Sequence, residues 1–347
     1  MNIRLSDPWE RYSRQILFHG IGLEGQKKLK ASRVAVVGVG ALGTVIANHL
    51  TRAGVGFIRL IDRDFVERSN LQRQMLFDES DADRLVPKAI AARDKLRAVN
   101  REVEIEAVVD HLSAENAEAL LTDVEIILDG TDNFAVRLLI NDVSVKHRIP
   151  WVHGAVVRAR GIHAFFHPPK TPCYRCLFPQ PPEGGGETCD TVGVIGPIVD
   201  IIASMEVTAA LKWIVGAADR LPTSLVDIDL WENAHAAIDI SGAKNANCPA
   251  CGLGRYEFLD ERRGEAISSV LCGRNAVQIT PYGRRTLDLH AVRARWNALG
   301  HVRESPHLLR LEQEGLTLTL FRDGRLIVQG TDDVAHAERL YAEYVGR

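Results

Sequence analysis

The sequence has no excess of basic charge and no long uninterrupted apolar run. It contains 42 Lys and Arg residues against 45 Asp and Glu residues, a net charge of −3, so it offers little to neutralise a nucleic-acid backbone. Its most apolar stretch, residues 196–218, is interrupted by Asp200, Glu206 and Lys212. Charges at membrane depth are costly, so this stretch predicts a buried helix. We expect neither nucleic acid nor a membrane as a partner.

The first seven residues lack an apolar run and a small-residue cleavage pattern, which predicts no signal peptide and a cytoplasmic location. Internal repeats and long low-complexity tracts are also missing. Apolar residues make up 46 % and charged residues 25 %, as in ordinary globular proteins. A chain of 347 residues exceeds the usual size of one domain, so we expect a large domain and a small one.

Short apolar runs alternate with helical spacing through the first half of the chain, which predicts a Rossmann-like α/β fold with a doubly wound, mostly parallel sheet. After Pro150 the pattern changes to an appended hairpin, then a helix from about Pro197 and a further strand. The predicted strands are residues 34–37, 57–61, 103–105, 124–128, 151–157, 161–166 and 225–231, with a helix over 89–99.

The glycines at 252 and 254 mark a domain boundary, with residues 1–257 before it and a small α+β domain of residues 258–347 after it. Within the small domain we expect strands near 270 and 277 and over 308–311, 316–321 and 326–328, and helices over 288–299 and 334–344. A loop rich in proline and glycine, residues 179–186, is expected to be mobile.

A glycine motif, Gly38-x-Gly40-x-x-Gly43, separates the first strand from the first helix. Glycines there allow a phosphate to approach the backbone, and the helix N-terminus offers unpaired N–H groups. Asp62 ends the second strand, where a carboxylate can accept hydrogen bonds from ribose hydroxyls. The motif therefore predicts an adenine nucleotide site, without choosing between NAD and ATP.

The charged residues that follow favour ATP. Asp64, Arg73, Lys88 and Asp132 form a set that hydride transfer does not need, whereas displacement at an α-phosphate builds charge that Arg, Lys and carboxylate-held magnesium stabilise. This set favours adenylation over an NAD-dependent oxidoreductase.

Four of the six cysteines form two pairs, Cys173-x-x-Cys176 and Cys248-x-x-Cys251. The pairs could be redox dithiols, but four thiolates from two such knuckles make a closed tetrahedral zinc site. We therefore predict a structural zinc ion.

Several motifs in order resemble those of the ThiF/MoeB-type adenylyltransferases of the ubiquitin-activating-enzyme superfamily. The resemblance spans roughly residues 8–255 and rests on residues 11–15, the glycine loop, 69–74, 129–133, both cysteine pairs, and Cys189 ahead of 193–197.

This resemblance implies a role for each matching residue. Gly40 would lie against the nucleotide, Asp62 would hold the ribose, and Asn70, Arg73 and Lys88 would contact phosphates. Asp132 would hold magnesium. Arg14 would act as an arginine finger that reaches into the site from the other subunit of a homodimer. Further expected nucleotide contacts come from Gly38, Gly43, Asp64 and Gln74.

The resemblance also implies a reaction. ATP would adenylate the C-terminal Gly-Gly carboxylate of a ubiquitin-like sulfur carrier of the ThiS or MoaD type, releasing pyrophosphate, for thiamine or molybdopterin synthesis. Cys189 would either bond covalently to the carrier or be a spectator thiol. Residues 258–347 show no cysteine-arginine loop like that of a rhodanese domain, so a separate sulfur donor is expected. A different peptide or ubiquitin-like modifier as substrate, and a catalytically inactive scaffold, remain alternatives.

Overall fold

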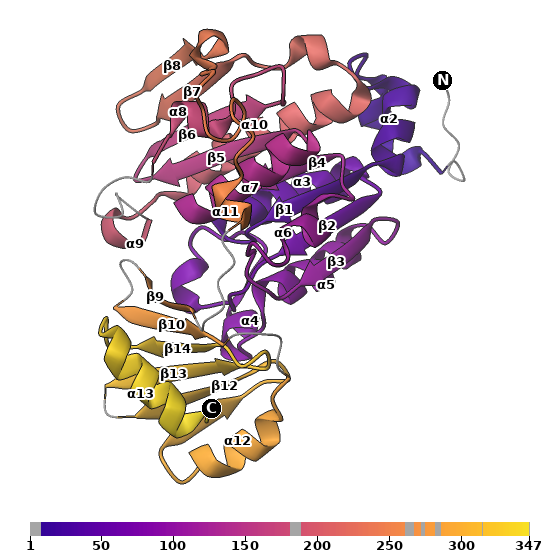
Figure 1. Ribbon diagram of the computed structural model, residues 1–347. Coiled ribbons are helices and arrows are strands. Elements are labelled where there is room, and N and C mark those ends of the chain that lie inside the picture. The colour runs from indigo at the N-terminus through magenta and orange to yellow at the C-terminus, as the bar shows by residue number, and fades with distance from the viewer. Residues whose placement is uncertain are drawn as a thin grey trace.

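The computed structural model describes residues 8–180, 189–260, 267–271, 275–281, 286–313 and 315–346. Its larger part is an eight-stranded sheet in the order β3-β2-β1-β4-β5-β6-β7-β8 (Figure 1). Along this order, the neighbouring strands from β3 through β2, β1 and β4 to β5 pair in parallel, and those from β5 to β8 pair antiparallel. This confirms the predicted α/β class. The strands are β1 Arg33–Val37, β2 Phe57–Ile61, β3 Glu104–Val108, β4 Ile126–Asp129, β5 Trp151–Val157, β6 Arg160–Phe166, β7 Ser224–Asp229 and β8 Ala234–Asp239.

Helices cover both faces of this sheet because successive side chains of a strand point to opposite sides. In β1, Val34 and Val36 pack with α3, α5 and α10, whereas Ala35 and Val37 pack with α6 and α7. All four side chains are buried. The helices of this part are α1 Ser13–Leu17, α2 Gly22–Ala31, α3 Ala41–Ala53, α4 Glu79–Asp83, α5 Lys88–Val99, α6 Ala117–Leu121, α7 Phe134–His147, α8 Tyr174–Leu177, α9 Cys189–Val192, α10 Gly196–Val215 and α11 Glu257–Asp260.

The order of the strands reverses between β1 and β4. The chain runs from β1 outward to β2 and β3, then returns to place β4 on the other side of β1. In doubly wound sheets, ligands bind outside the carboxyl ends of the strands at such a reversal. The topology therefore places the expected site beyond the ends of β1, β2 and β4.

A second sheet lies in the C-terminal part, in the antiparallel order β11-β12-β13-β14-β10-β9. One face packs on α12 and α13, and residues of the other face cluster with Phe65 and Leu85 of the larger part. Figure 1 shows this sheet next to α4. Its elements are β9 Ile267–Leu271, β10 Ala276–Thr280, α12 Leu289–Trp296, β11 His301–Glu304, β12 Leu308–Gln313, β13 Leu316–Phe321, β14 Leu326–Gln329 and α13 Val334–Tyr344.

Two strands, β8 and β11, were not expected from the sequence. Every residue of β8 is exposed and β11 is short and polar, so neither carries the alternation of buried and exposed side chains that signals a strand. Residues 181–186 of the predicted mobile loop lie outside the described residues. Within the described part of the chain, no helix is long and apolar enough to cross a membrane.

Candidate functional site

The glycine loop brings the backbone of β1, the start of α3 and the segment after β4 into close contact. Gly38 has a φ of +85°, and a Cβ there would lie 2.7 Å from the Gly130 carbonyl oxygen. A Cβ on Gly43 would lie 1.9 Å from the Gly38 carbonyl oxygen. By contrast, a Cβ on Gly40 would meet nothing nearer than the Gln74 side chain at 3.7 Å. Gly38 and Gly43 therefore permit the tight packing, and Gly40 borders open space.

Gly40 is also the N-cap of α3, and no side chain caps this helix. The first N–H groups of a helix have no partner within it, and they attract anions. Because Gly40 and Ala41 line the pocket described below, the start of α3 offers these donors to a bound phosphate.

The Asp62 carboxylate stands at the end of β2 and is tied to the backbone on both oxygens. Oδ2 accepts a hydrogen bond from the Val39 N–H at 2.7 Å, and Oδ1 accepts one from the Asp64 N–H, also at 2.7 Å. Burial raises the pKa of Asp62, and the nearby Lys88 ammonium opposes that shift. The carboxylate is thus fixed beside the glycine loop.

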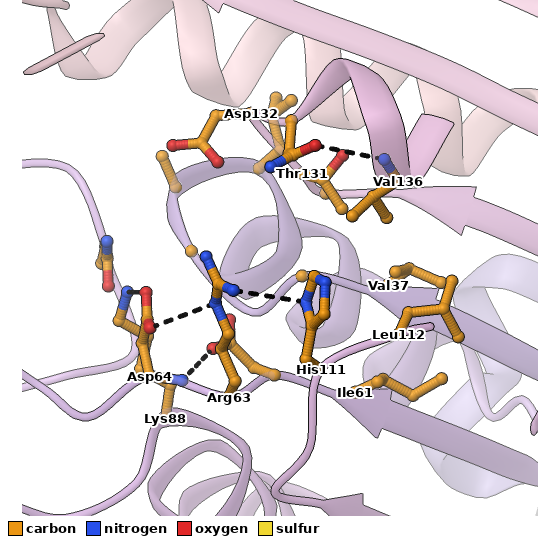
Figure 2. Close-up of a pocket in the computed structure, with 18 of the residues that line it drawn as sticks. Val37, Ile61, Arg63, Asp64, Lys88, His111, Leu112, Thr131, Asp132 and Val136 are labelled. Carbon is orange, nitrogen blue, oxygen red and sulfur yellow. Dashed lines mark hydrogen bonds and ion pairs between the residues drawn. The ribbon is translucent and has the colours of Figure 1, made fainter. Parts of the chain in front are cut away.

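A pocket opens beyond the carboxyl ends of the parallel strands, with a volume of about 960 Å³ including its open mouth. Its polar side holds the Lys88 ammonium, which is buried and lies 3.5 Å from the Asp64 carboxylate (Figure 2). The site residues that sequence analysis predicted and that line this pocket are Gly38, Gly40, Asp62, Asp64, Arg73, Gln74, Lys88, Asp132 and Cys189.

One end of the pocket is apolar and was not foreseen from the sequence. Val37, Ile61 and Leu112 gather there beside His111 (Figure 2). His111 Nδ1 lies 3.5 Å from Arg63 Nη1, and burial, aided by Arg63, lowers the pKa of His111 to about 3. A neutral ring with apolar neighbours suits a flat aromatic base.

A buried charge network supports the loop that carries Asp132. Asp129 Oδ1 accepts a hydrogen bond from the Thr131 N–H at 2.9 Å, and Asp129 Oδ2 lies 2.9 Å from Arg137 Nε and 2.8 Å from His153 Nδ1. Burial alone would raise the pKa of Asp129, but Arg137, His153 and Thr131 together outweigh burial and the pKa is lowered. Asp129 therefore stays ionised and holds the loop, while Asp132 is exposed at the pocket.

Cys189 is the first residue of α9, and its thiol donates to the Val156 carbonyl oxygen at a distance of 3.2 Å. Cys189 lines the same pocket as Asp132.

The two cysteine pairs, 75 positions apart in the chain, meet in space. All four sulfur atoms lie within 4.8 Å of one another, at 3.8 Å for Cys173 and Cys176, 3.6 Å for Cys173 and Cys248, and 3.4 Å for Cys176 and Cys251. Four sulfurs around a tetrahedral zinc ion stand about 3.8 Å apart. Burial raises the pKa of Cys251 to about 11, a shift that a cation bound to its thiolate would oppose. The cluster fits zinc.

Comparison with known proteins identifies the family. The model of the ThiF family matches residues 12–250. The chain belongs to the ThiF family. It is 42 % identical over 337 residues to the sulfur carrier protein ThiS adenylyltransferase of Bacillus subtilis, covering 97 % of this chain and 99 % of that protein. It is 38 % identical over 249 residues to the sulfur carrier protein adenylyltransferase of Thermus thermophilus, covering 70 % of this chain and 90 % of that protein.

A solved structure supports the fold of this ThiF-family chain. The crystal structure of E. coli MccB with ATP matches with a TM-score of 0.61 at 22 % identity, over 70 % of this chain and 75 % of that chain. The alignment with the Bacillus protein covers more of the chain than the family model does, so it extends into the C-terminal sheet.

Three predicted nucleotide-site residues of this ThiF-family chain, Arg14, Gly43 and Asn70, lie outside the pocket lining. Gly43 packs against the Gly38 backbone instead. Arg14 is exposed on α1. Asn70 is buried, and its side-chain oxygen accepts a hydrogen bond from the Glu67 N–H at 3.3 Å. Sequence analysis missed the supporting roles of Asp129 and Arg137, although Asp129 belongs to the motif of residues 129–133. A charge partner eight residues away cannot be recognised before the loop is folded.

Proposed function

We propose that this chain is an adenylyltransferase that joins the AMP moiety of ATP to the C-terminal Gly-Gly carboxylate of a ubiquitin-like sulfur carrier and releases pyrophosphate. The observation that carries the proposal is the meeting of the glycine loop, Asp62, Arg73, Lys88 and Asp132 in one pocket. The printed names of the Bacillus and Thermus relatives support the substrate class.

The reaction asks for charge neutralisation rather than proton transfer. A C-terminal carboxylate has a pKa near 3.5 and is already ionised at neutral pH, so it needs no general base. One carboxylate oxygen attacks the α-phosphorus, and the bond from the α-phosphorus to the bridging oxygen breaks as pyrophosphate leaves. Positioned cations lower the energy of the charge that builds on the phosphate oxygens.

Each pocket side chain has a place in this scheme. The free acceptor capacity of Asp62 takes the ribose hydroxyls, and the adenine lies at the apolar end near Leu112. Lys88 and Arg73 face the phosphates, with Gly38, Gly43, Asp64, Asn70 and Gln74 as further members of the nucleotide site. Gln74 supports this assignment because it lines the pocket and its Nε2, a hydrogen-bond donor, is the nearest atom to a Cβ placed on Gly40, at 3.7 Å.

Asp132 is our candidate for the magnesium ligand. Its carboxylate is exposed at the pocket and suits a hard oxygen-seeking cation. Bound magnesium would supply charge neutralisation at the phosphates. The chain's own contribution is to hold that carboxylate in place through the Asp129 and Arg137 pair.

The cysteine cluster is proposed to hold structural zinc. Its four thiols leave no open ligand position, so the ion would connect two parts of the chain without reacting. We further propose a cytoplasmic homodimer in which Arg14 of one subunit reaches the phosphates in the other, since Arg14 lies outside the pocket of its own chain. A separate protein would donate the sulfur. The division into residues 1–257 and 258–347 is part of the same proposal.

The test is ATP–pyrophosphate exchange with purified protein and candidate Gly-Gly carriers added one at a time. Exchange that depends on one carrier, and that is lost in Asp132→Ala, is the expected result. A carrier lacking its last glycine serves as the matched negative control. ATP binding without exchange for any carrier would contradict the proposed substrate, and fluorescence from bound NADH without ATP binding would contradict the reaction class.

A further inference from the structure

The C-terminal domain makes one polar contact directly behind the nucleotide pocket. Arg325 Nη2 donates a hydrogen bond to the Arg63 carbonyl oxygen at 2.8 Å. Arg63 lies between Asp62 and Asp64, and all three residues line the pocket. A residue 262 positions away in the sequence therefore touches the backbone of the pocket wall.

The peptide unit that Arg325 contacts also holds the Asp62 carboxylate. The Arg63 carbonyl and the Asp64 N–H belong to the same planar unit, so turning one turns the other. The carbonyl accepts from Arg325, and the N–H donates to Asp62 Oδ1 at 2.7 Å. Arg325 is thus connected to Asp62 through two hydrogen bonds and one rigid plane.

Arg325 is held in place from several sides. Its side chain is 2 % exposed, and its guanidinium lies 4.0 Å from the centre of the Phe321 ring. The Phe321 ring in turn lies 6.2 Å from the Phe65 ring, so aromatic contact joins the two domains next to the hydrogen bond. Arg303 adds a second polar contact, to the Asp83 carbonyl oxygen at 2.6 Å.

Burying the Arg325 guanidinium carries a desolvation penalty that its few polar contacts do not offset. Nε and Nη1 are buried without a hydrogen-bond partner in the described part of the chain, and Nε lies 3.6 Å from Asp323 Oδ2. An apolar side chain could fill the same space without that desolvation penalty. The donor at Nη2 is what an apolar residue could not supply.

We propose that Arg325 is a positioning residue of the nucleotide site, through which the C-terminal domain sets the orientation of Asp62 and hence recognition of the ribose. The inference rests on the proposed role of Asp62 as the ribose ligand. It gives the small domain a task in ATP selection, which the sequence alone did not assign.

The experiment compares binding of ATP and of 2′-deoxy-ATP and 3′-deoxy-ATP to the full chain by calorimetry, alongside ATP–pyrophosphate exchange. Arg325→Met removes the donor and keeps an apolar side chain of similar length. We expect the Kd and KM for ATP to rise about five- to tenfold with little change in kcat, the loss of roughly one hydrogen bond. The preference for ATP over the deoxy nucleotides should fall by a similar factor.

Two further variants separate positioning from general damage. Arg325→Lys keeps a charged donor and should recover part of the preference. Arg322→Met removes an exposed cation from the same part of the C-terminal domain and should leave every value unchanged. If Arg325→Met melts well below the wild type, the preference of Arg325→Lys for ATP over the deoxy nucleotides is compared with that of the wild type instead. We expect that preference to be partly reduced.

An unchanged preference for ATP over the deoxy nucleotides in a stably folded Arg325 variant would overturn the inference, as would a wild type that binds all three nucleotides equally. Failure of the proposed function looks different. The wild type would then bind ATP and discriminate the deoxy forms, but it would catalyse no carrier-dependent exchange.

Discussion

Replacing one cysteine of the cluster should release zinc and destabilise the larger domain. Cys248→Ser removes one of four ligands, and the ion connects positions 75 apart in the chain. A cross-link that closes a loop of this length stabilises by about 4.5 kcal/mol in the chain-entropy model, which treats the cluster as a single link. For a domain of this size, that corresponds to a Tm lowered by about 9 to 18 °C.

The assay pairs scanning calorimetry with metal analysis of the same freshly purified sample. Cys189→Ser is the matched control, since it changes a cysteine outside the cluster. We expect the control to keep one zinc per chain and the wild-type Tm. Cys248→Ser should contain no zinc and melt at a lower temperature. A zinc-free Cys248→Ser protein that melts within about 2 °C of the wild type would refute the cross-link argument, and full zinc retention would refute the ligand set.

Three other changes test separate parts of the account. Lys88→Met should lower the rate of pyrophosphate exchange by about 10²- to 10³-fold, because the pocket loses a buried cation that we propose contacts the phosphates. Lys95→Met on the same helix, outside the pocket, is its control, and equal rates for the two variants would exclude the phosphate role. Burial raises the pKa of Glu206, so the native state keeps a proton that the unfolded chain releases above the ordinary carboxyl pKa of 4.5. The wild type therefore loses stability as pH rises above that value, and Glu206→Gln should stabilise the fold by an amount that grows with pH. Urea unfolding of both proteins from about pH 5 to pH 8 measures this, and parallel stability curves would show that Glu206 is not protonated in the native state. If Cys189 attacks the acyl-adenylate to form a thioester and release AMP, Cys189→Ala should abolish a thiol-labile covalent complex with the carrier, seen by non-reducing electrophoresis, and persistence of the complex would exclude that role.

Local patterns were enough to predict most of the fold. The run Phe57–Ile61 was expected as a strand and forms β2 with the same bounds, because all five side chains are buried. The helix expected over 334–344 likewise forms α13, which Asp333 caps through its side chain. Signals of this kind lie within a few neighbouring residues, so the sequence displays them directly.

The site was predictable where a motif carries its own geometry. The glycine loop and the two cysteine pairs have fixed spacings, and the structure brings each set together as expected. The Asp129 and Arg137 ion pair and the contact from Arg325 to Arg63 were not predictable, because each depends on where a folded element comes to lie. Long-range contacts of this kind leave no spacing in the sequence to recognise.

The central claim is that the carrier's carboxylate becomes joined to AMP. Its most direct test uses a carrier whose C-terminal carboxylate is labelled with oxygen-18, followed by cleavage of the product with a sulfur nucleophile and mass analysis of the AMP. Attack at the acyl carbon expels AMP with the bridging oxygen, so the account predicts AMP carrying one labelled oxygen. Unlabelled AMP would contradict acyl-adenylate formation.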